Sequence, residues 1–374
     1  MPAAHHVLLV PGFFGFATLG EFAYFAHVRD FLAEALPAAG VKGEVEVVHT
    51  IPTASLARRA AILAESAAAI AEKGDGVSLV GHSSGGLDAR LLVTPDATLP
   101  TKADVERCAG AVRAVVTVAT PHFGTPLAHT FETLLGEQLL KVLSVATIYG
   151  LRAGRLPLGV VLRLARVFRG RAAPKGVVDQ LWAQLLHDFS ADRRRAIQAF
   201  FAEVGSDRDL VAQITPAGTE LFNAATRDRP GVRYGCVVTR ARPPGLRSLL
   251  RAGVDPYAHA THALFAALYR LAARTRPDRV RVPRERIAAL SRAYRSRVDE
   301  RVNDGMVPTL SQVWGETIRA VWADHHDVIG HFHHPTHVPP HFDWVASGTG
   351  FTRAHFEAVW RDVAAFVAAA GGKA

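Results

Sequence analysis

The stretch VSLVGHSSGG, residues 77–86, decides the fold, because an apolar run ends there on a serine set between glycines. Glycine costs backbone entropy and offers no side chain to pack, so a central strand gains little from Gly81, Gly85 and Gly86. G-x-S-x-G at the end of a buried strand is instead the pattern of a tight turn into a helix, which exposes a nucleophilic serine. The stretch therefore predicts Ser83 as a nucleophile, with the glycines leaving room for the turn and the next helix.

Short apolar runs recur along the chain with helix-like segments between them. Such alternation is typical of a parallel sheet covered by helices on both faces. We therefore predict an α/β fold with a mostly parallel central sheet. The predicted strands span residues 6–10, 45–49, 77–81, 112–120 and 232–238, and the clearest helix starts after Thr53 or Ser55 and closes at Gly74.

The strand pattern stops between residues 128 and 213, which predicts a helical cap inserted into a core of residues 1–127 and 214–374. Within it, residues 138–178 carry eight Lys and Arg and no acidic residue, among leucine- and valine-rich turns. One interpretation is a lid that lifts from an acyl pocket and meets an anionic lipid surface. The other is a fixed cap whose arginines keep it soluble.

Composition narrows the class of protein. The chain has 374 residues, 49% of them hydrophobic, so it can bury a sizeable core. The net charge of +9 could favour an anionic partner, but no nucleic-acid module appears and a solvated arginine-rich surface is the simpler interpretation.

The N-terminus lacks the pattern of a signal peptide and no long apolar run is free of charge, so we expect a cytoplasmic protein without a membrane span. Cys108 and Cys236 are expected as small buried side chains, with one disulfide left open.

A nucleophilic serine needs an acid and a base, which follow it along the chain in this kind of fold. Asp304 lies in a turn-like N-D-G context, and His325 and His326 begin 21 residues later. We predict Asp304 as the acid and this pair as the source of the base. His82 and His122 precede the acid and are interpreted as supporting or packing residues.

The segment VPGFFGF follows the first predicted strand and can supply half of an oxyanion hole. Gly12 allows the backbone to turn so that the Phe13 N–H faces the nucleophile, with the N–H of Ser84 as its partner. The side chain of Ser84 is given no chemical role. Phe13, Phe14 and Phe16 would make the mouth of the substrate pocket apolar, which favours an acyl chain.

These motifs, in this order, resemble the bacterial triacylglycerol lipases of the α/β-hydrolase fold. The resemblance implies that fold with an inserted helical cap, Ser83 as nucleophile, Asp304 as acid, His325 as base, and the amides of Phe13 and Ser84 as oxyanion donors. It covers most of the chain and rests on VLLVPGFFGF, GHSSGGLDARLL, VVTVATPHFGTPLA, ITPAGTELFNAATRDRPGVRY, NDGMVPTLSQVWG and DHHDVIGHF.

The sequence departs from that family at several positions. Pro11 stands where the family usually has histidine, and His326 where it usually has leucine. Many relatives hold a structural calcium ion near the catalytic histidine, and Asp327 matches one ligand position. His331 and Phe332 stand where further oxygen ligands are expected, which argues against calcium, an ion that takes six to eight oxygens.

The run HHDVIGHFHHPTHVPPHFDW holds seven histidines, and imidazoles at this density could bind zinc or nickel. No pair has the spacing of a known zinc motif. The alternative interpretation is a solvated loop interrupted by prolines.

The leading functional hypothesis is a lipase-like serine carboxylester hydrolase that cleaves acyl esters, triacylglycerols among them, through an acyl-enzyme and without a cofactor. Its partners would be an acyl ester or lipid and, through the basic cap, a lipid surface, but not a nucleic acid. A thioesterase or an acyltransferase would use the same triad. From a different class, a catalytically silent α/β-hydrolase could act as a binding module.

Overall fold

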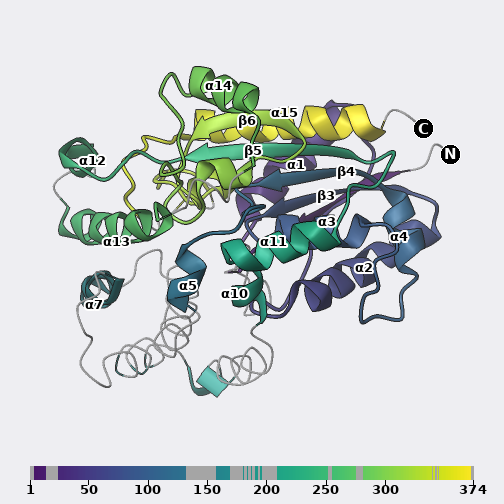
Figure 1. Cartoon of the computed structure of the whole chain (residues 1–374), viewed down its shortest axis with the longest axis horizontal. Helices are drawn as coiled ribbons and strands as arrows, with labels where there is room; N and C mark the ends of the chain where they lie inside the picture. Colours follow the sequence, from purple (N-terminus) through teal and green to yellow (C-terminus); the bar gives the residue numbers. More distant parts are fainter. Residues whose placement is uncertain are drawn as a thin grey trace.

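One six-stranded sheet forms the centre of the molecule (Figure 1). The structure, a computed structural model, describes residues 4–13, 24–131, 157–168, 209–251, 255–274, 281–338 and 345–371, with single positions between them. All neighbouring strands pair in parallel, in the order β2-β1-β3-β4-β5-β6. The strands are β1 His5–Val10, β2 Val45–Val47, β3 Gly76–His82, β4 Val112–Val118, β5 Arg233–Arg240 and β6 Glu316–Trp322. The five predicted strands and their parallel arrangement are confirmed.

Strand β6 was not predicted, because it lies at the edge of the sheet. Glu316 and Thr317 are exposed and most of its other residues are half-buried. Its sequence ETIRAVW therefore lacks the continuous apolar run that marks a strand buried on both faces.

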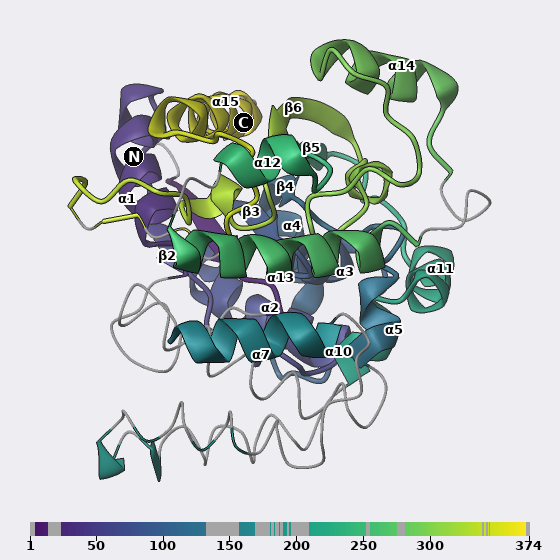
Figure 2. The same cartoon turned by 90° about the vertical axis from the view of Figure 1, so that its left-hand side faces the viewer.

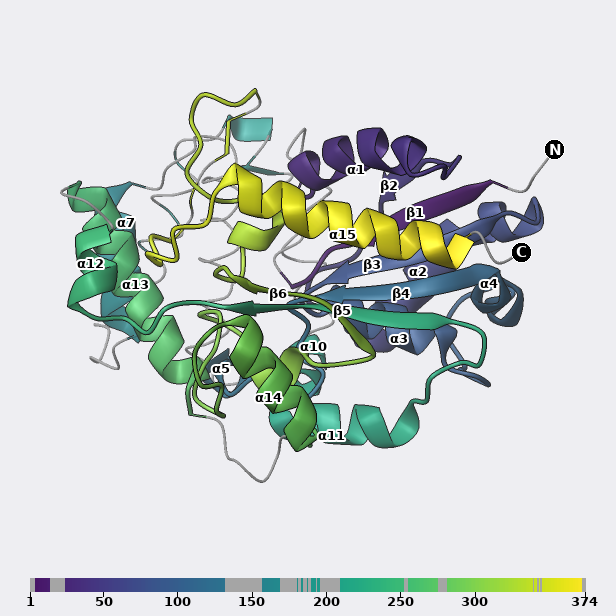
Figure 3. The ribbon, with the colours of Figure 1, turned by 90° about the horizontal axis from the view of Figure 1, so that it is seen from above.

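Helices cover both faces of the sheet, as predicted (Figure 3). On one face α1 (Ala26–Ala38) lies beside α15 (Arg353–Gly371). On the other face α2 (Leu56–Glu72), α3 (Gly85–Val93) and α4 (Val105–Ala111) pack together. Helix α2 begins after Ser55, whose hydroxyl accepts a hydrogen bond from the Arg58 N–H at 3.4 Å, and Gly74 follows its end with φ +76°. The predicted cap and stop of this helix are confirmed.

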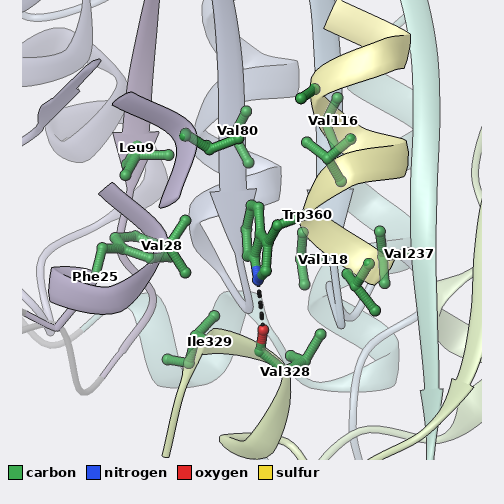
Figure 4. Packing of buried hydrophobic residues seen from close by; sticks show 14 of the residues in the cluster. Leu9, Phe25, Val28, Val80, Val116, Val118, Val237, Val328, Ile329 and Trp360 are labelled. Carbon is green, nitrogen blue, oxygen red and sulfur yellow. Dashed lines mark hydrogen bonds between the residues drawn. The ribbon is translucent and has the colours of Figure 1, made fainter. Parts of the chain in front are cut away.

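Trp360 of α15 is the centre of the core beneath α1 and α15 (Figure 4). It is fully buried, and its indole N–H donates to the carbonyl of Val328 at 2.9 Å. Val328 belongs to the short 3-10 helix η3, Asp327–Ile329, which directly follows the histidine pair. Since truncating a buried tryptophan costs about 3–5 kcal/mol, this packing holds the segment after His325 firmly against the sheet.

Most of the predicted cap, including all of 138–156, lies outside the described residues. Its described parts are helical, and α7 (Leu158–Phe168) lies against α13 (Pro256–Ala272) beyond the carboxyl ends of the strands (Figure 2). The other helices in the described part of the chain are α5 Leu127–Phe131, α10 Asp209–Gln213, α11 Pro216–Ala225, α12 Leu246–Arg251, α14 Arg284–Ala293 and the 3-10 helix η2 Thr309–Gln312.

Cys108 and Cys236 are both buried free thiols, so the disulfide that the sequence left open is not formed. No helix among the described residues is long and apolar enough to cross a membrane.

Candidate active site

Ser83 lies on the tight turn between β3 and α3, as the glycine pattern predicts. Its φ is +55°, a left-handed conformation that is strained for a residue with a side chain. The turn is possible because its neighbours lack side chains: a Cβ on Gly81 would lie 2.4 Å from the backbone of Gly85. The strain aims the serine side chain out of the sheet at its carboxyl edge.

The turn after β1 brings the predicted oxyanion segment onto the serine. A Cβ on Gly12 would lie 2.5 Å from the Cβ of Ser83 and 3.1 Å from its Oγ, so only glycine fits there. Phe13 follows and is buried. Ser84 directly precedes α3, so its N–H is among the amides at a helix start that the helix itself leaves unpaired. The Ser84 hydroxyl is buried without a hydrogen-bond partner in the described part of the chain, in keeping with its having no chemical role.

Asp304 and His325 are brought together by two hydrogen bonds. His325 Nδ1 lies 2.9 Å from Asp304 Oδ2, and the His325 backbone N–H donates to the Asp304 carbonyl at 3.0 Å. Both residues are buried. His326 is also buried, but its ring lies against His82 and His331. Of the histidine pair, the structure thus joins His325 to the predicted acid.

The carboxylate of Asp304 is held by several donors at once. Its Oδ1 accepts the backbone N–H groups of Met306 at 2.9 Å and Val307 at 2.7 Å. Its Oδ2 accepts the Thr239 hydroxyl at 2.8 Å and the Gln312 side-chain amide at 3.2 Å. Donors of this number fix the orientation of the carboxylate toward His325.

Ser83, His325 and Phe13 line one cavity of about 40 Å³. Phe14 and Phe16, the other predicted pocket residues, lie outside the described residues. The rest of the wall is mostly apolar: Pro121, Thr125, Leu127, Ala128, Phe131, Val211, Ile214, Met306 and Val307.

His82, next to the nucleophile, links three segments of the site. Its Nδ1 lies 2.6 Å from the Tyr24 hydroxyl, and its Nε2 lies 2.8 Å from the His325 carbonyl. The Tyr24 hydroxyl also accepts a hydrogen bond from the backbone N–H of Gly12. Because a carbonyl only accepts, Nε2 carries the proton and Tyr24 donates to Nδ1. Burial lowers the pKa of His82 well below its usual value, so this supporting histidine is neutral.

A buried ion pair holds the oxyanion segment from behind. Arg59 and Asp88 are both fully buried and joined at 2.7 Å. A second guanidinium N–H of Arg59 donates to the Pro11 carbonyl at 2.7 Å. Burial raises the pKa of Asp88 to about 6, and the Arg59 charge opposes that rise. Pro11, where the resembling family has histidine, thus receives its support through its carbonyl.

Three carboxylates meet close to the histidine pair. Oxygens of Asp324, Asp327 and Asp343 lie within 4.8 Å of one another. Burial raises the pKa of Asp324 to about 6, and burial with repulsion from Asp324 raises the pKa of Asp327 and Asp343 well above the ordinary range. Oδ2 of Asp324 is buried without a hydrogen-bond partner among the described residues. Converging carboxylate oxygens, one of them unsatisfied, fit a hard divalent cation, and Asp327 and Asp343 also line a cavity of about 490 Å³ that gives it a way in.

The part of the chain around Ser83 matches a known protein family. Residues 56–155, which include Ser83, match a family described as "Putative serine esterase (DUF676)". This match covers less than half of the chain and supports a serine esterase. A search of curated protein sequences gave no match.

Solved structures resemble the chain over almost its whole length. EstA from Clostridium botulinum has a TM-score of 0.56 at 18% identity, covering 98% of this chain and 87% of that one. Lipase 1 from Pelosinus fermentans has a TM-score of 0.53 at 17% identity, covering 97% and 99%. The metagenomic carboxyl esterase MGS0156 has a TM-score of 0.51 at 18% identity, covering 98% and 76%. At these identities the likeness shows the fold, and the predicted α/β-hydrolase fold is confirmed.

Proposed function

We propose that the protein is a serine carboxylester hydrolase that cleaves acyl esters through an acyl-enzyme. One observation carries the proposal: His325, bonded to Asp304 at 2.9 Å, lines the same cavity as Ser83 on its strained turn. A nucleophile, a base and an orienting acid in this relation are the parts that acyl transfer requires.

In the proposed reaction the Ser83 hydroxyl attacks the ester carbonyl while Nε2 of His325 takes its proton. The carbonyl oxygen becomes an oxyanion that accepts hydrogen bonds from the backbone N–H groups of Phe13 and Ser84. The C–O bond to the alcohol then breaks, and the imidazolium of His325 returns the proton to the leaving alcohol. Water attacks the resulting acyl-enzyme, again with His325 as base, and the acid is released with Ser83 restored.

Asp304 acts on the reaction through His325. Because its carboxylate accepts the Nδ1–H, the lone pair of the imidazole stays on Nε2, where a base is needed. The bonds from Thr239 and Gln312 hold that carboxylate in place.

The walls of the cavity favour an acyl chain as the substrate part bound next to Ser83, since most of its lining is apolar. A buried water needs about 10–15 Å³ of this kind of volume, so about 40 Å³ holds a short acyl group. Esters of short acids are therefore the expected substrates, and long chains, as in triacylglycerols, would have to extend beyond this cavity.

A lipid surface is a further proposed partner. Leu158 and Leu162 of α7 are 41% and 48% exposed, and Leu246 and Leu250 of α12 are 72% and 71% exposed. Leucines four residues apart lie on one face of a helix, as in interfacial helices. Sedimentation with anionic vesicles tests this: salt-sensitive binding that Leu246→Ser with Leu250→Ser weakens is expected, and no binding at low salt would contradict it.

The proposed reaction needs no cofactor, but the acidic cluster fits calcium. Asp324, Asp327 and Asp343 would hold the ion. It would neutralise their repulsion and thereby steady the segment that carries His325.

Labelling by a fluorophosphonate together with hydrolysis of p-nitrophenyl esters of increasing acyl length tests the proposed function. Ser83→Ala should abolish both, with a rate loss of roughly 10⁶-fold, while the protein stays folded. Ser84→Ala is the matched control and should keep both, because only its backbone is used. Activity that survives in Ser83→Ala would refute the assignment.

The same experiment separates the alternatives. A silent binding module would not be labelled at all. A thioesterase would be labelled but would prefer acyl thioesters over the matching oxygen esters, and an acyltransferase would transfer the acyl group to an added alcohol faster than to water.

A further inference from the structure

A second cluster of side chains lies outside the candidate active site, where α1 meets the loop after η3. Nitrogen atoms of His27, His337 and His341 lie within 4.8 Å of one another. The rings of His27 and His341 stack with centroids 3.5 Å apart and an interplanar angle of 14°. His27 comes from the first turn of α1, and the two others lie more than 300 residues later in the histidine-rich run.

In two of these rings the hydrogen bonding indicates a nitrogen that can face a ligand. Nδ1 of His341 donates to the Gly330 carbonyl at 2.7 Å, which leaves its Nε2 with a lone pair. Nδ1 of His27 is buried without a hydrogen-bond partner in the described part of the chain.

This arrangement has the form of metal ligation. Imidazoles that bind a metal through one nitrogen usually donate the other N–H to a backbone carbonyl or a carboxylate, which fixes the ring and its tautomer.

We propose that His27, His337 and His341 bind one zinc ion, with water as the fourth ligand. Three nitrogen donors suit zinc, which prefers imidazole and thiolate and is usually tetrahedral, and they do not suit calcium. Ligand nitrogens around zinc lie roughly 3.3 Å apart, and the lone pair of each imidazole lies in its ring plane, so the stacked rings of His27 and His341 would turn out of their face-to-face arrangement to close on the ion.

The backbone around the cluster is built to bring these rings together. His334 and His341 pair through two backbone hydrogen bonds, at 3.2 and 3.1 Å, which closes the loop carrying His337. Gly330 has φ +109°, and a Cβ there would lie 2.9 Å from the Cβ of His27. The zinc ion would thus tie α1 to the loop that begins five residues after His325, and it is independent of the proposed hydrolysis.

Binding of zinc to the full-length protein without a histidine tag tests the proposal. After dialysis against a chelator, isothermal titration calorimetry with ZnCl₂ should give one tight site, and Co²⁺ should develop the visible bands of a four-coordinate nitrogen site. His337→Ala should weaken zinc binding at least about 100-fold, since loss of even an outer-shell partner costs 10–100-fold. His337 is half-buried, so its loss should leave the fold intact.

His333→Ala is the matched control, because this exposed histidine belongs to the same run but not to the cluster. It should bind zinc like the wild type. His27→Ala should repeat the loss seen in His337→Ala, which would show that the site joins two distant parts of the chain. Equal zinc affinity in the wild type and His337→Ala, or an equal loss in His333→Ala, would overturn the proposal.

Discussion

The hydroxyl of Tyr24 should matter for both stability and turnover, although the proposed chemistry does not use it directly. It is buried, receives the Gly12 N–H and donates to His82, which in turn holds the His325 carbonyl. Tyr24→Phe removes one oxygen and leaves two buried polar groups without a partner. Each such group costs about 1–3 kcal/mol, so the free energy of unfolding should fall by about 3 kcal/mol.

The effect on turnover follows from the position of Gly12, which precedes the proposed oxyanion donor Phe13. Loss of a whole oxyanion donor costs about 10²–10³ in kcat. In Tyr24→Phe the donor remains but its segment is less firmly held, so kcat should fall by about 10-fold to 100-fold with little change in KM.

The assay is urea unfolding together with steady-state hydrolysis of a short p-nitrophenyl ester. Tyr234→Phe is the matched control, because the Tyr234 hydroxyl accepts one hydrogen bond, from the Arg229 N–H at 2.8 Å, at the amino end of β5 away from the site. It should cost about 1 kcal/mol and leave kcat unchanged. If Tyr24→Phe lowers stability but keeps kcat within twofold of the wild type, the link through His82 is structural only and the reasoning fails.

Three further predictions concern the acid, the acidic cluster and a buried histidine. Asp304→Asn should lower kcat about 10⁴-fold without unfolding the protein, because an asparagine can leave His325 in the wrong tautomer; ester hydrolysis and circular dichroism check this, and a loss under tenfold would contradict it. Calcium at 100 times its dissociation constant should raise the melting temperature by about 3 °C, and Asp343→Asn, which breaks the cluster, should remove that response. Burial, with the nearby Arg90 charge, lowers the pKa of His122 well below 6.5. Below pH 6.5 the unfolded chain therefore binds a proton at this residue and the folded chain does not, so the free energy of unfolding falls as the pH falls. Between pH 6.5 and 5 that loss is up to about 2 kcal/mol, and His122→Asn should show a correspondingly flatter pH dependence in urea unfolding.

Local patterns were enough to predict the parts of the site that depend on neighbouring residues. The turn at Ser83 needs glycines within a few positions, and the order of serine, acid and histidine along the chain indicates Asp304 and the pair His325 and His326. The family resemblance selects His325 from that pair. The buried strands and α2 could also be predicted, because each is marked by a pattern of apolar residues within its own sequence. Edge strand β6 has no such pattern, because half of its surface faces solvent.

The supporting residues could not be predicted, because their partners are distant in sequence. Tyr24 lies 58 residues from His82, and Gln312 bonds Thr239 73 residues away. A tyrosine or glutamine with a buried polar partner looks, in sequence alone, like any half-buried residue. One signal was available: the D in GGLDARLL is an acid in an otherwise apolar helix start, which calls for a buried cation such as Arg59.

The two clusters near His325 join residues that are far apart in sequence, so spacing along the chain does not predict them. The expectation against calcium considered oxygen ligands at His331 and Phe332. The acidic cluster takes Asp324 from before the histidine pair and Asp343 from beyond the proline-rich loop. The proposed zinc site has no recognisable spacing for a similar reason, since its first histidine belongs to α1.

The ion pair of Arg59 and Asp88 adds a physical reason for regarding this end of the sheet as the functional one. Replacing a buried ion pair by apolar residues of similar volume is often neutral or stabilising, so stability alone does not explain why α2 and α3 carry these charges. The positions of Arg59 and Asp88 in the fold explain why these charges are there. Asp88 belongs to the helix that starts behind Ser83, and Arg59 joins it to the carbonyl of Pro11, one residue before Gly12. The pair therefore helps to fix the distance between the nucleophile turn and the oxyanion segment, a distance that the proposed transition state needs held constant.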